Sequence, residues 1–501
     1  GRQLVGTKSG LPLEKTDCVS CGQCVNACPC GALDYRMERG KVFRAINDPK
    51  KTVVAFVAPA VRSVVSSYFG ISYAEASPFI AGLLKKLGFD KVFDFSFAAD
   101  LTVVEETTEF LNRLNTKGVM PQFTSCCPGW VNFVEKRYPQ LIPHLSSCKS
   151  PQAMMGAIVK NHYTQYAGIA KEDLFVVSIV PCIAKKYEAA RPEFAPGGIR
   201  DVDAVLTTTE MLGMVEYMQI TKEDVELSEF DAPYRRVSGA GILFGASGGV
   251  AEAALRMAVE KLTGQLLTDH LDFTEVRGFQ GVKESTIEIN DISLNVAVIN
   301  GLHNVEPLIE KIMQGEEVGY DLIEVMACPG GCICGAGHPV PEKIDELENR
   351  QQVLINIDKI SKYRKSQENP DILRLYEEFF GEPNSELAHK LLHTHYTPAS
   401  GDMIVKVGRK MADSAFLTSE FTVCTCNACS ELGAHDLYNR IVEKVTRLKM
   451  DPFVRVFTMR LKDNHAHAGE RVYVALNGRP IDPDIGNICR FIKHPGEVYD
   501  V

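Results

Sequence analysis

Three short cysteine clusters lie far apart in this chain, each surrounded by glycine, proline or lysine. They read T-S-C-C-P-G-W at Thr124–Trp130, V-P-C-I-A-K-K-Y-E at Val180–Glu188 and E-V-M-A-C-P-G-G-C at Glu324–Cys332. Thiolates are the soft ligands that iron–sulfur clusters need, and a cubane [4Fe-4S] cluster takes four of them. Cysteines acting as small apolar side chains would explain Cys148 or Cys489, but not a C-P-G-G-C turn. We therefore expect the three loops to converge on one metal site.

A fourth cluster, near the start of the chain, has the spacing of a bacterial ferredoxin, C-x2-C-x2-C-x3-C-P. In two-cluster ferredoxins the fourth cysteine of this run ligates the other cluster. Cys18, Cys21 and Cys24 are thus predicted to hold one [4Fe-4S] cluster and Cys28 to belong to a second, with a zinc site as the alternative. The second cluster lacks further ligands here and the chain begins without methionine, so we expect a preceding N-terminal portion.

Composition limits the class of protein. The 501 residues should form more than one domain, since domains usually have about 100–200 residues. The net charge of -10 argues against a nucleic-acid partner. We find neither a signal peptide nor an apolar stretch near the ~20 residues that a membrane span requires. The 16 cysteines, grouped in clusters, indicate metal ligands in a reducing compartment, so we expect a cytoplasmic metalloprotein.

The elements that must position these loops follow an α/β pattern. Apolar runs predict strands, and helical periodicity between them predicts helices. The expected strands are Thr52–Ala58, Lys91–Phe95, Leu174–Ile179, Ala204–Leu206, Leu294–Ile299 and Tyr320–Met326, and the expected helices include Phe79–Leu87, Val250–Lys261 and Val305–Gln314. This alternation predicts parallel sheets covered on both faces, with ligand loops at the carboxyl ends of the strands. F-G-A-S-G-G-V at Phe244–Val250 lacks the spacing of a nucleotide loop and resembles a segment of the family named below, which implies close backbone packing beside the cluster.

Taken together and in this order, the three clusters resemble the signature motifs of the [FeFe]-hydrogenases, from about Thr16 to about Pro398. The resemblance implies a two-lobed hydrogenase domain at 49–339, a partial ferredoxin-like domain at 1–48 and a helical, small-subunit-like wrapping segment at 340–398. It also implies an H-cluster, in which Cys127, Cys182, Cys328 and Cys332 ligate a [4Fe-4S] cluster. Cys332 would bridge to a diiron unit carrying carbonyl, cyanide and azadithiolate ligands.

The same resemblance assigns residues around the diiron unit. Lys185 matches the lysine that contacts a cyanide ligand, although a solvated surface lysine is the alternative. Pro59, Gln152 and Met326 match further contacts.

A proton path is also implied. Cys126 matches the relay cysteine, and Glu106, Ser146, Glu109 and Arg113 match the onward carriers. Carboxylates and hydroxyls suit a relay because each can accept and donate a proton within hydrogen-bond reach. Without the neighbouring cysteine motif, V-E-E-T-T-E-F would be interpreted as an exposed helix face.

Some positions depart from the family's usual pattern. Val180 stands where methionine is usual, and Gly335–Pro339 reads G-A-G-H-P in place of G-G-G-Q-P. Cys334 is an additional thiol. His393 and His395 in the wrapping segment are interpreted as surface or capping residues rather than a metal pair.

The last part of the chain is expected to begin with a linker at 399–416. Cys424-x4-Cys429, with the strand and turn at Val472–Gly478, resembles a thioredoxin-like [2Fe-2S] domain at 417–501. His465 and His467 replace the usual second cysteine pair, so loss of the cluster is favoured over a Rieske-type site.

The sequence therefore predicts an [FeFe]-hydrogenase subunit from an anaerobic system that interconverts H2 with protons and electrons. The resemblance to multimeric, electron-bifurcating enzymes implies as partners ferredoxin, a flavoprotein NAD(P)-binding subunit and a small iron–sulfur subunit. A hydrogen-sensing regulator and a non-catalytic iron–sulfur scaffold are the alternatives. The first tends to lose the relay cysteine, and the second departs from the full cysteine motifs.

Overall fold

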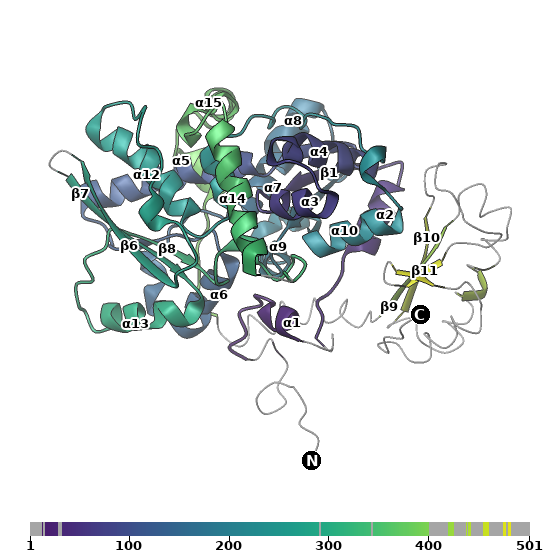
Figure 1. Ribbon diagram of the computed structural model, residues 1–501, viewed down its shortest axis with the longest axis horizontal. Helices are drawn as coiled ribbons and strands as arrows, with labels where there is room; N and C mark the ends of the chain where they lie inside the picture. The colour runs from purple at the N-terminus through teal and green to yellow at the C-terminus, as the bar shows by residue number, and fades with distance from the viewer. Residues whose placement is uncertain are drawn as a thin grey trace, which may run out of the picture.

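The computed structural model describes residues 13, 16–28, 33–289, 292–341, 344–399, 419–424, 437, 439–441, 454–459, 474–476 and 479–481. Two lobes, each containing a four-stranded sheet, make up the main body (Figure 1). Among the helices described, none is both long enough and apolar enough to cross a membrane.

The first lobe contains a fully parallel sheet in the order β2-β1-β4-β5. Its strands are β1 (Thr52–Val57), β2 (Lys91–Asp94), β4 (Leu174–Val180) and β5 (Ala204–Thr207). Nearly every side chain in these strands is buried, as predicted for parallel strands covered on both faces. The covering helices are α2 (Arg39–Ile46), α3 (Val61–Phe69), α4 (Tyr73–Lys86), α7 (Pro151–Ile158), α8 (Thr164–Ala167), α9 (Ala184–Ala189) and α10 (Thr208–Tyr217).

The second lobe contains a mixed sheet in the order β3-β8-β7-β6. Its strands are β3 (Gln122–Phe123), β8 (Leu322–Met326), β7 (Ile292–Asn300) and β6 (Val282–Ile289). The expectation of a parallel sheet needs a correction here, because β6 pairs with β7 in the antiparallel direction. The exposure of its side chains alternates, with Val282, Glu284, Thr286 and Glu288 exposed and the residues between them buried or partly buried, as is typical of an edge strand with one solvated face.

Side chains on β7 alternate between the two faces of this sheet, as the twofold period of a strand requires. Leu294, Val296 and Val298 pack against α12 (Gly249–Thr263). Ile299 packs on the other face, where α6 (Pro128–Arg137) and α13 (Leu302–Met313) lie. Figure 1 shows α12 and α13 on opposite sides of the strands.

Two long helices connect the lobes. The 21-residue helix α5 (Ser96–Thr116) follows β2 and packs on α7 of the first lobe and on α12 of the second. Helix α14 (Ile344–Ile360) runs between the lobes in Figure 1 and contacts α3, α4 and α11 (Gly239–Leu243). The two sheets are thereby held at a defined distance from each other.

The glycine-rich segment 244–250 packs closely against its neighbours, as predicted. Gly248 has a φ of 90°, and a Cβ placed on it would lie 1.9 Å from the carbonyl oxygen of Val276. A Cβ on Gly249 would lie 1.8 Å from the carbonyl oxygen of Leu243. Only glycine fits either position. The start of α12 therefore lies directly beside β8. There the side chain of Glu324 accepts hydrogen bonds from the N–H groups of Gly248 (2.7 Å) and Ala251 (2.8 Å).

The wrapping segment is helical, as expected. It consists of α14, α15 (Pro370–Leu375), a π-helical turn (Tyr376–Phe380) and α16 (Glu386–Leu392). One prediction was right only in part: His393 is the C-cap residue of α16, as a capping role requires, but it is only 6% exposed, because the chain after α16 forms a bridge with Cys148. His395, two residues further, is exposed as predicted.

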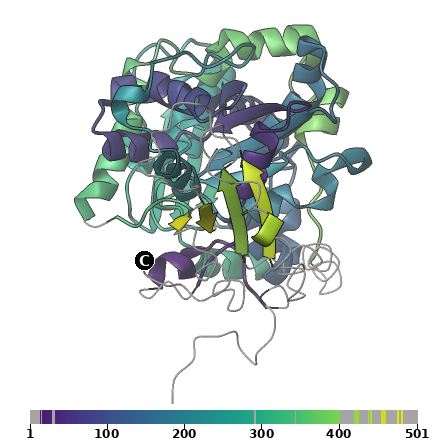
Figure 2. The ribbon, with the colours of Figure 1, turned by 90° about the vertical axis from the view of Figure 1, so that its right-hand side faces the viewer.

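Near the C-terminus, four short strands form a sheet in the order β10-β9-β11-β12 (Figure 2). They are β9 (Ser419–Cys424), β10 (Val454–Met459), β11 (Val474–Leu476) and β12 (Arg479–Ile481). β9 and β10 are parallel and the other pairs antiparallel, which agrees with the expected thioredoxin-like arrangement. The linker beyond residue 399, Cys429, His465 and His467 lie outside the described residues.

The close approach at Gly248 leads to a stability prediction. Gly248→Ala should lower the free energy of unfolding by about 2–4 kcal/mol, from backbone strain and overpacking against the Val276 carbonyl. Gly264→Ala is the matched control, because Gly264 has a φ of 67° but no atom lies within 4 Å of the point that its Cβ would occupy. The control should lose only about 1–2 kcal/mol. Calorimetric unfolding of both variants measures the difference, and equal losses would contradict the packing argument.

Candidate metal centre

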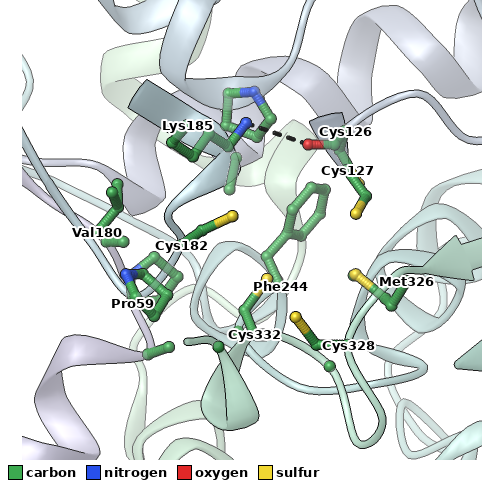
Figure 3. A pocket seen from close by; sticks show the side chains of 18 of the residues that line it. Pro59, Cys126, Cys127, Val180, Cys182, Lys185, Phe244, Met326, Cys328 and Cys332 are labelled. Carbon is green, nitrogen blue, oxygen red and sulfur yellow. Dashed lines mark hydrogen bonds between the residues drawn. The ribbon is translucent and has the colours of Figure 1, made fainter. Parts of the chain in front are cut away.

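The four cysteines expected to ligate one cluster line a single cavity between the lobes (Figure 3). Cys182 follows β4, Cys127 directly precedes α6 beyond β3, and Cys328 and Cys332 follow β8. The cavity contains about 740 Å³ of space outside the atoms, part of which is open to solvent.

Two glycines give the third loop its shape. Gly330 and Gly331 have φ values of 81° and 86°. A Cβ on Gly331 would lie 2.5 Å from the backbone nitrogen of Ser247, within the glycine-rich segment described above. The N–H of Gly330 donates to the side-chain oxygen of Asn300 at the end of β7 (2.9 Å). The C-P-G-G-C sequence therefore turns tightly enough for both cysteines to face the cavity.

The donor set fits a [4Fe-4S] cluster. The four cysteines are free thiols, and three of them interact electrostatically with Cys127. Burial, followed by the effect of neighbouring Cys127, raises the pKa of Cys182 to about 12. Four free cysteines, of which Cys328 is buried and the other three partly buried, are the ligands that a cubane cluster takes as thiolates. Cys127, Cys182, Cys328 and Cys332 are the residues that would hold it.

Lys185 is buried at the rim of this cavity rather than solvated. Its Nζ donates to the carbonyl oxygen of Cys126 (3.1 Å) and to both carboxylate oxygens of Glu188 (3.2 and 3.0 Å). Burial opposes the charge on Lys185, but Glu188 more than compensates and raises its pKa. The ammonium group is thus kept charged beside a mainly apolar space.

The other expected contacts of the diiron unit fall in two places. Pro59 and Met326 line the cavity, together with Val180 and Phe244 (Figure 3). Gln152 instead supports Lys185, because its Nε2 donates to the Lys185 carbonyl oxygen and to Glu188 (both 3.0 Å). Packing of the segment 244–250 beside the cluster is expected from the sequence, and Phe244 and Gly245 do line the cavity.

Cys126 also lines the cavity, next to the ligand Cys127, and is 9% exposed. Burial first, and then the neighbouring Glu106, raises the pKa of the Cys126 thiol well above its ordinary value, so the thiol stays protonated. Glu106 lies on α5 and accepts from the backbone N–H of Ser125 (3.3 Å). Burial and the nearby Glu109 raise the pKa of Glu106 to about 8.

The remaining carriers continue from Glu106 to the surface. Ser146 interacts with Glu106 and donates from its hydroxyl to Oε2 of Glu109 (2.9 Å). Glu109 forms an ion pair with Arg113 (2.6 Å), whose side chain is 17% exposed. The structure therefore brings Glu106, Ser146, Glu109 and Arg113 into one row of interacting side chains, with Cys126 near Glu106 at its inner end.

Sequence reasoning missed a group of side chains beside Glu109. Cys148 and His393 approach it from two different segments, and Glu105 holds the far side of the imidazole. The wrong interpretation of His393 as a surface residue hid this group. The only signal in the sequence was the position of Cys148, two residues after Ser146.

The ferredoxin-like segment lies directly beside the cavity. Cys21 interacts electrostatically with Cys18, Cys24 and also Cys127. Gly129 lies between the two sites, because a Cβ on it would be 2.9 Å from Ala327, 3.7 Å from Cys21 and 4.0 Å from the Cys127 sulfur. Cys28 ends the short helix α1 (Gln23–Ala27) and is partly buried.

Gln23 connects the two cysteine sites directly. It lies between Cys21 and Cys24, and its Nε2 donates to the sulfur of Cys328 (3.0 Å) and to the carbonyl oxygen of Cys334 (3.1 Å). A hydrogen bond to a ligand sulfur is one of the factors that set the reduction potential of an iron–sulfur cluster.

The comparisons with known proteins agree with this site. Residues 51–336 match the family described as iron only hydrogenase large subunit, C-terminal domain. Residues 344–399 match the iron hydrogenase small subunit, and residues 12–34 match a 4Fe-4S binding domain. The chain belongs to the iron-only hydrogenases.

Individual relatives support the same assignment. The NADP-reducing hydrogenase subunit HndD of Solidesulfovibrio fructosivorans is 46% identical over 77% of this chain and 67% of its own length. Iron hydrogenase 1 of Clostridium pasteurianum is 41% identical over 77% of this chain and 75% of its own. The structure of the [FeFe]-hydrogenase HydA1 from Chlamydomonas reinhardtii has a TM-score of 0.64 and 40% identity, and covers 72% of this chain and 99% of its own.

A more distant relative has a different description. The cytosolic Fe-S cluster assembly factor narfl of Danio rerio is 30% identical over 69% of this chain and 86% of its own length.

The contact of Gln23 with Cys328 leads to a prediction. Gln23→Leu should lower the reduction potential of the cluster held by the four cavity cysteines. The N–H···S bond stabilises the more negative, reduced state of the cluster, and the variant lacks this bond. Asn26→Leu, on the same helix, is the control. A redox titration followed by electron paramagnetic resonance compares both variants with the parent. An unchanged potential in Gln23→Leu would show that the hydrogen bond has no electronic role.

Proposed function

We propose that this chain is a catalytic hydrogenase subunit that reversibly interconverts H2 with protons and electrons at an H-cluster. The observation that carries the proposal is the position of Cys126. It is a thiol that faces the same cavity as the four ligand cysteines and stands at the inner end of a row of acidic and hydroxyl side chains. When bound, the diiron unit supplies the site at which H2 is formed or split.

Protons move between this cavity and solvent through the side chains of the chain itself. With a pKa of about 8, Glu106 can hold a proton near neutral pH and release it again. Ser146 accepts and donates through one hydroxyl, and Glu109 exchanges protons at the outer end beside Arg113. Since Cys126 stays protonated, it transfers a proton by giving one while receiving another.

Lys185 holds a positive charge against the cavity and thereby favours anionic ligands such as cyanide. Glu188, Gln152 and the Cys126 carbonyl fix its position. Pro59 and Met326 contribute the apolar wall that excludes water.

Cys18, Cys21 and Cys24 would hold a [4Fe-4S] cluster that would supply electron transfer to and from the cavity, and Cys28 would serve a second cluster. The contact of Gln23 with Cys328 and the glycine between Cys21 and Cys127 support this route, because both bring the two sites together. Cys424 and Cys429 belong to a domain that has lost its [2Fe-2S] cluster, given the absence of a second cysteine pair in the sequence.

We further propose a cytoplasmic, multi-subunit enzyme whose partners are a flavoprotein NAD(P)-binding subunit, a small iron–sulfur subunit and ferredoxin. The relative HndD, described as a subunit of an NADP-reducing hydrogenase, supports such partners. Electron bifurcation would take place at the flavin of a partner subunit. The net charge of -10 argues against nucleic acid as a partner.

The proposal is tested by infrared spectroscopy of protein produced together with the hydrogenase maturation proteins. Cyanide and carbonyl bands, with H2 evolution from a reduced electron donor, are expected. Absence of both after full maturation would favour a scaffold protein like the assembly factors.

The role of Cys126 leads to a mutational prediction. Cys126→Ala should lower turnover by about 10²–10⁴, the usual contribution of a positioned acid–base group, with metal content and infrared bands intact. Cys126→Asp should retain more activity, because a carboxylate still carries a proton. Loss of iron in the alanine variant would indicate a ligand, and near-normal H2 evolution with full metal content would contradict the path.

The proposed partners are tested by purifying the native complex without dissociating it. A flavin-containing subunit should copurify, and hydrogen should reduce NAD(P) only while that subunit is present. A fully active chain isolated alone, without flavoprotein, would be the contrary result.

A further inference from the structure

Beside the outer carboxylate of the proton path, three different metal-binding groups face one another. They are Oε2 of Glu109, the sulfur of Cys148 and Nδ1 of His393, and all three atoms lie within 4.8 Å of one another. The Cys148 sulfur is 3.8 Å from Glu109 Oε2 and 3.9 Å from His393 Nδ1. The three residues come from α5, the loop after β3 and the end of the wrapping segment, so only the folded chain brings them together.

These separations are close to those of a zinc site. Zinc lies about 2.3 Å from sulfur and about 2.0 Å from nitrogen or oxygen, and tetrahedral geometry then holds two ligand atoms roughly 3.5 Å apart. The two distances from the Cys148 sulfur therefore require shifts of only a few tenths of an ångström, and the ligand atoms of Glu109 and His393, within 4.8 Å of each other, would approach each other on binding. Ser147 Oγ lies 2.8 Å from His393 Nδ1 and donates to Glu109 Oε2 (3.2 Å), so this hydroxyl is in position to be the fourth ligand.

The imidazole is already oriented for a metal. Nε2 of His393 lies 3.0 Å from Oε2 of Glu105, a carboxylate that also accepts from the Tyr376 hydroxyl and the Asn384 backbone N–H. Glu105 acts as an acceptor, so Nε2 donates to it; in the neutral imidazole Nδ1 then has a lone pair for an ion on the side of Cys148 and Glu109. A carboxylate behind the histidine is the usual support of a metal-bound imidazole.

The charges also match. A Cys148 thiolate and the Glu109 carboxylate together neutralise a divalent cation, while Arg113 remains on the other oxygen of Glu109. One thiolate and one imidazole select a borderline-soft ion such as Zn²⁺ over Mg²⁺ or Ca²⁺. Glu109 is partly exposed, with a side chain 12% accessible, so an ion from solvent can reach it.

The geometry points to a regulatory or inhibitory zinc site formed by Glu109, Cys148 and His393, which blocks the proton path when it is occupied. A carboxylate bound to a metal cannot exchange protons with Ser146. Glu109 would thus be lost to the relay without any change at the cluster ligands. The binding of zinc at this site does not depend on the proposed function, whereas the inhibition of turnover rests on it.

The binding is tested by zinc-edge X-ray absorption on the holoenzyme with one equivalent of Zn²⁺. One sulfur at about 2.3 Å and two or three nitrogen or oxygen atoms at about 2.0 Å are expected. Cys148→Ala should remove the sulfur contribution, and Cys334→Ala, the matched control, should leave it unchanged. Four sulfur ligands would place the ion in an iron–sulfur site, and that result or an unchanged sulfur signal in Cys148→Ala would overturn the proposal.

The inhibition is tested by H2 evolution against free Zn²⁺, with each variant compared to its own rate without zinc. Chelation should restore the rate. Glu105→Gln, which weakens the support of His393 without touching the ion, should raise the half-inhibiting concentration about 10–100-fold, and Cys148→Ala by at least as much. If zinc binds with one sulfur ligand but turnover stays complete, the zinc site is supported. The same result would overturn the inhibitory role of the site and the proton path through Glu109. Inhibition equal in Cys148→Ala and parent would overturn the assignment of the site.

Discussion

Four thiol groups have to meet inside one cavity although three loops from two different sheets carry them. Cys182 comes from the first lobe, and Cys127, Cys328 and Cys332 come from the second. Each sheet must therefore present the carboxyl ends of its strands to the same space, and the distance between the sheets must stay constant. Helices α5 and α14 meet this requirement, because both pack on elements that hold the loops.

Helix α14 also shows how the wrapping segment supports the site. Leu354 packs with Ile333 from the third loop, and Arg350 donates to the carbonyl oxygens of Ile333 (3.2 Å) and Pro339 (3.0 Å). The loop that carries Cys332 is thus held from outside by a segment more than ten residues further along the chain. The match of residues 344–399 to a hydrogenase small subunit fits this role.

Buried charge around the cavity is compensated by short-range partners. Glu188 neutralises Lys185 and also accepts from Ser150 (2.8 Å) and Gln152, so the ammonium group is buried without being unpaired. Glu106 differs from Glu188, since it has no cationic partner among the interactions described and its pKa is raised. The Lys185–Glu188 pair therefore keeps its charges, whereas Glu106 can take up and release a proton.

The cysteine positions, the strand runs and the glycine-rich turns could be predicted from the sequence, because ligand type and local periodicity are properties of short segments. Thr52–Val57 and the C-P-G-G-C turn needed no tertiary information. Whether a polar residue such as Lys185 or His393 is buried depends on which distant segment covers it, and no local pattern records that. The sequence by itself therefore determined the ligands and the family resemblance. Only the tertiary structure decided the antiparallel edge strand β6, the link from Gln23 to Cys328, and the meeting of Glu109, Cys148 and His393, because each depends on contacts between residues far apart in the chain.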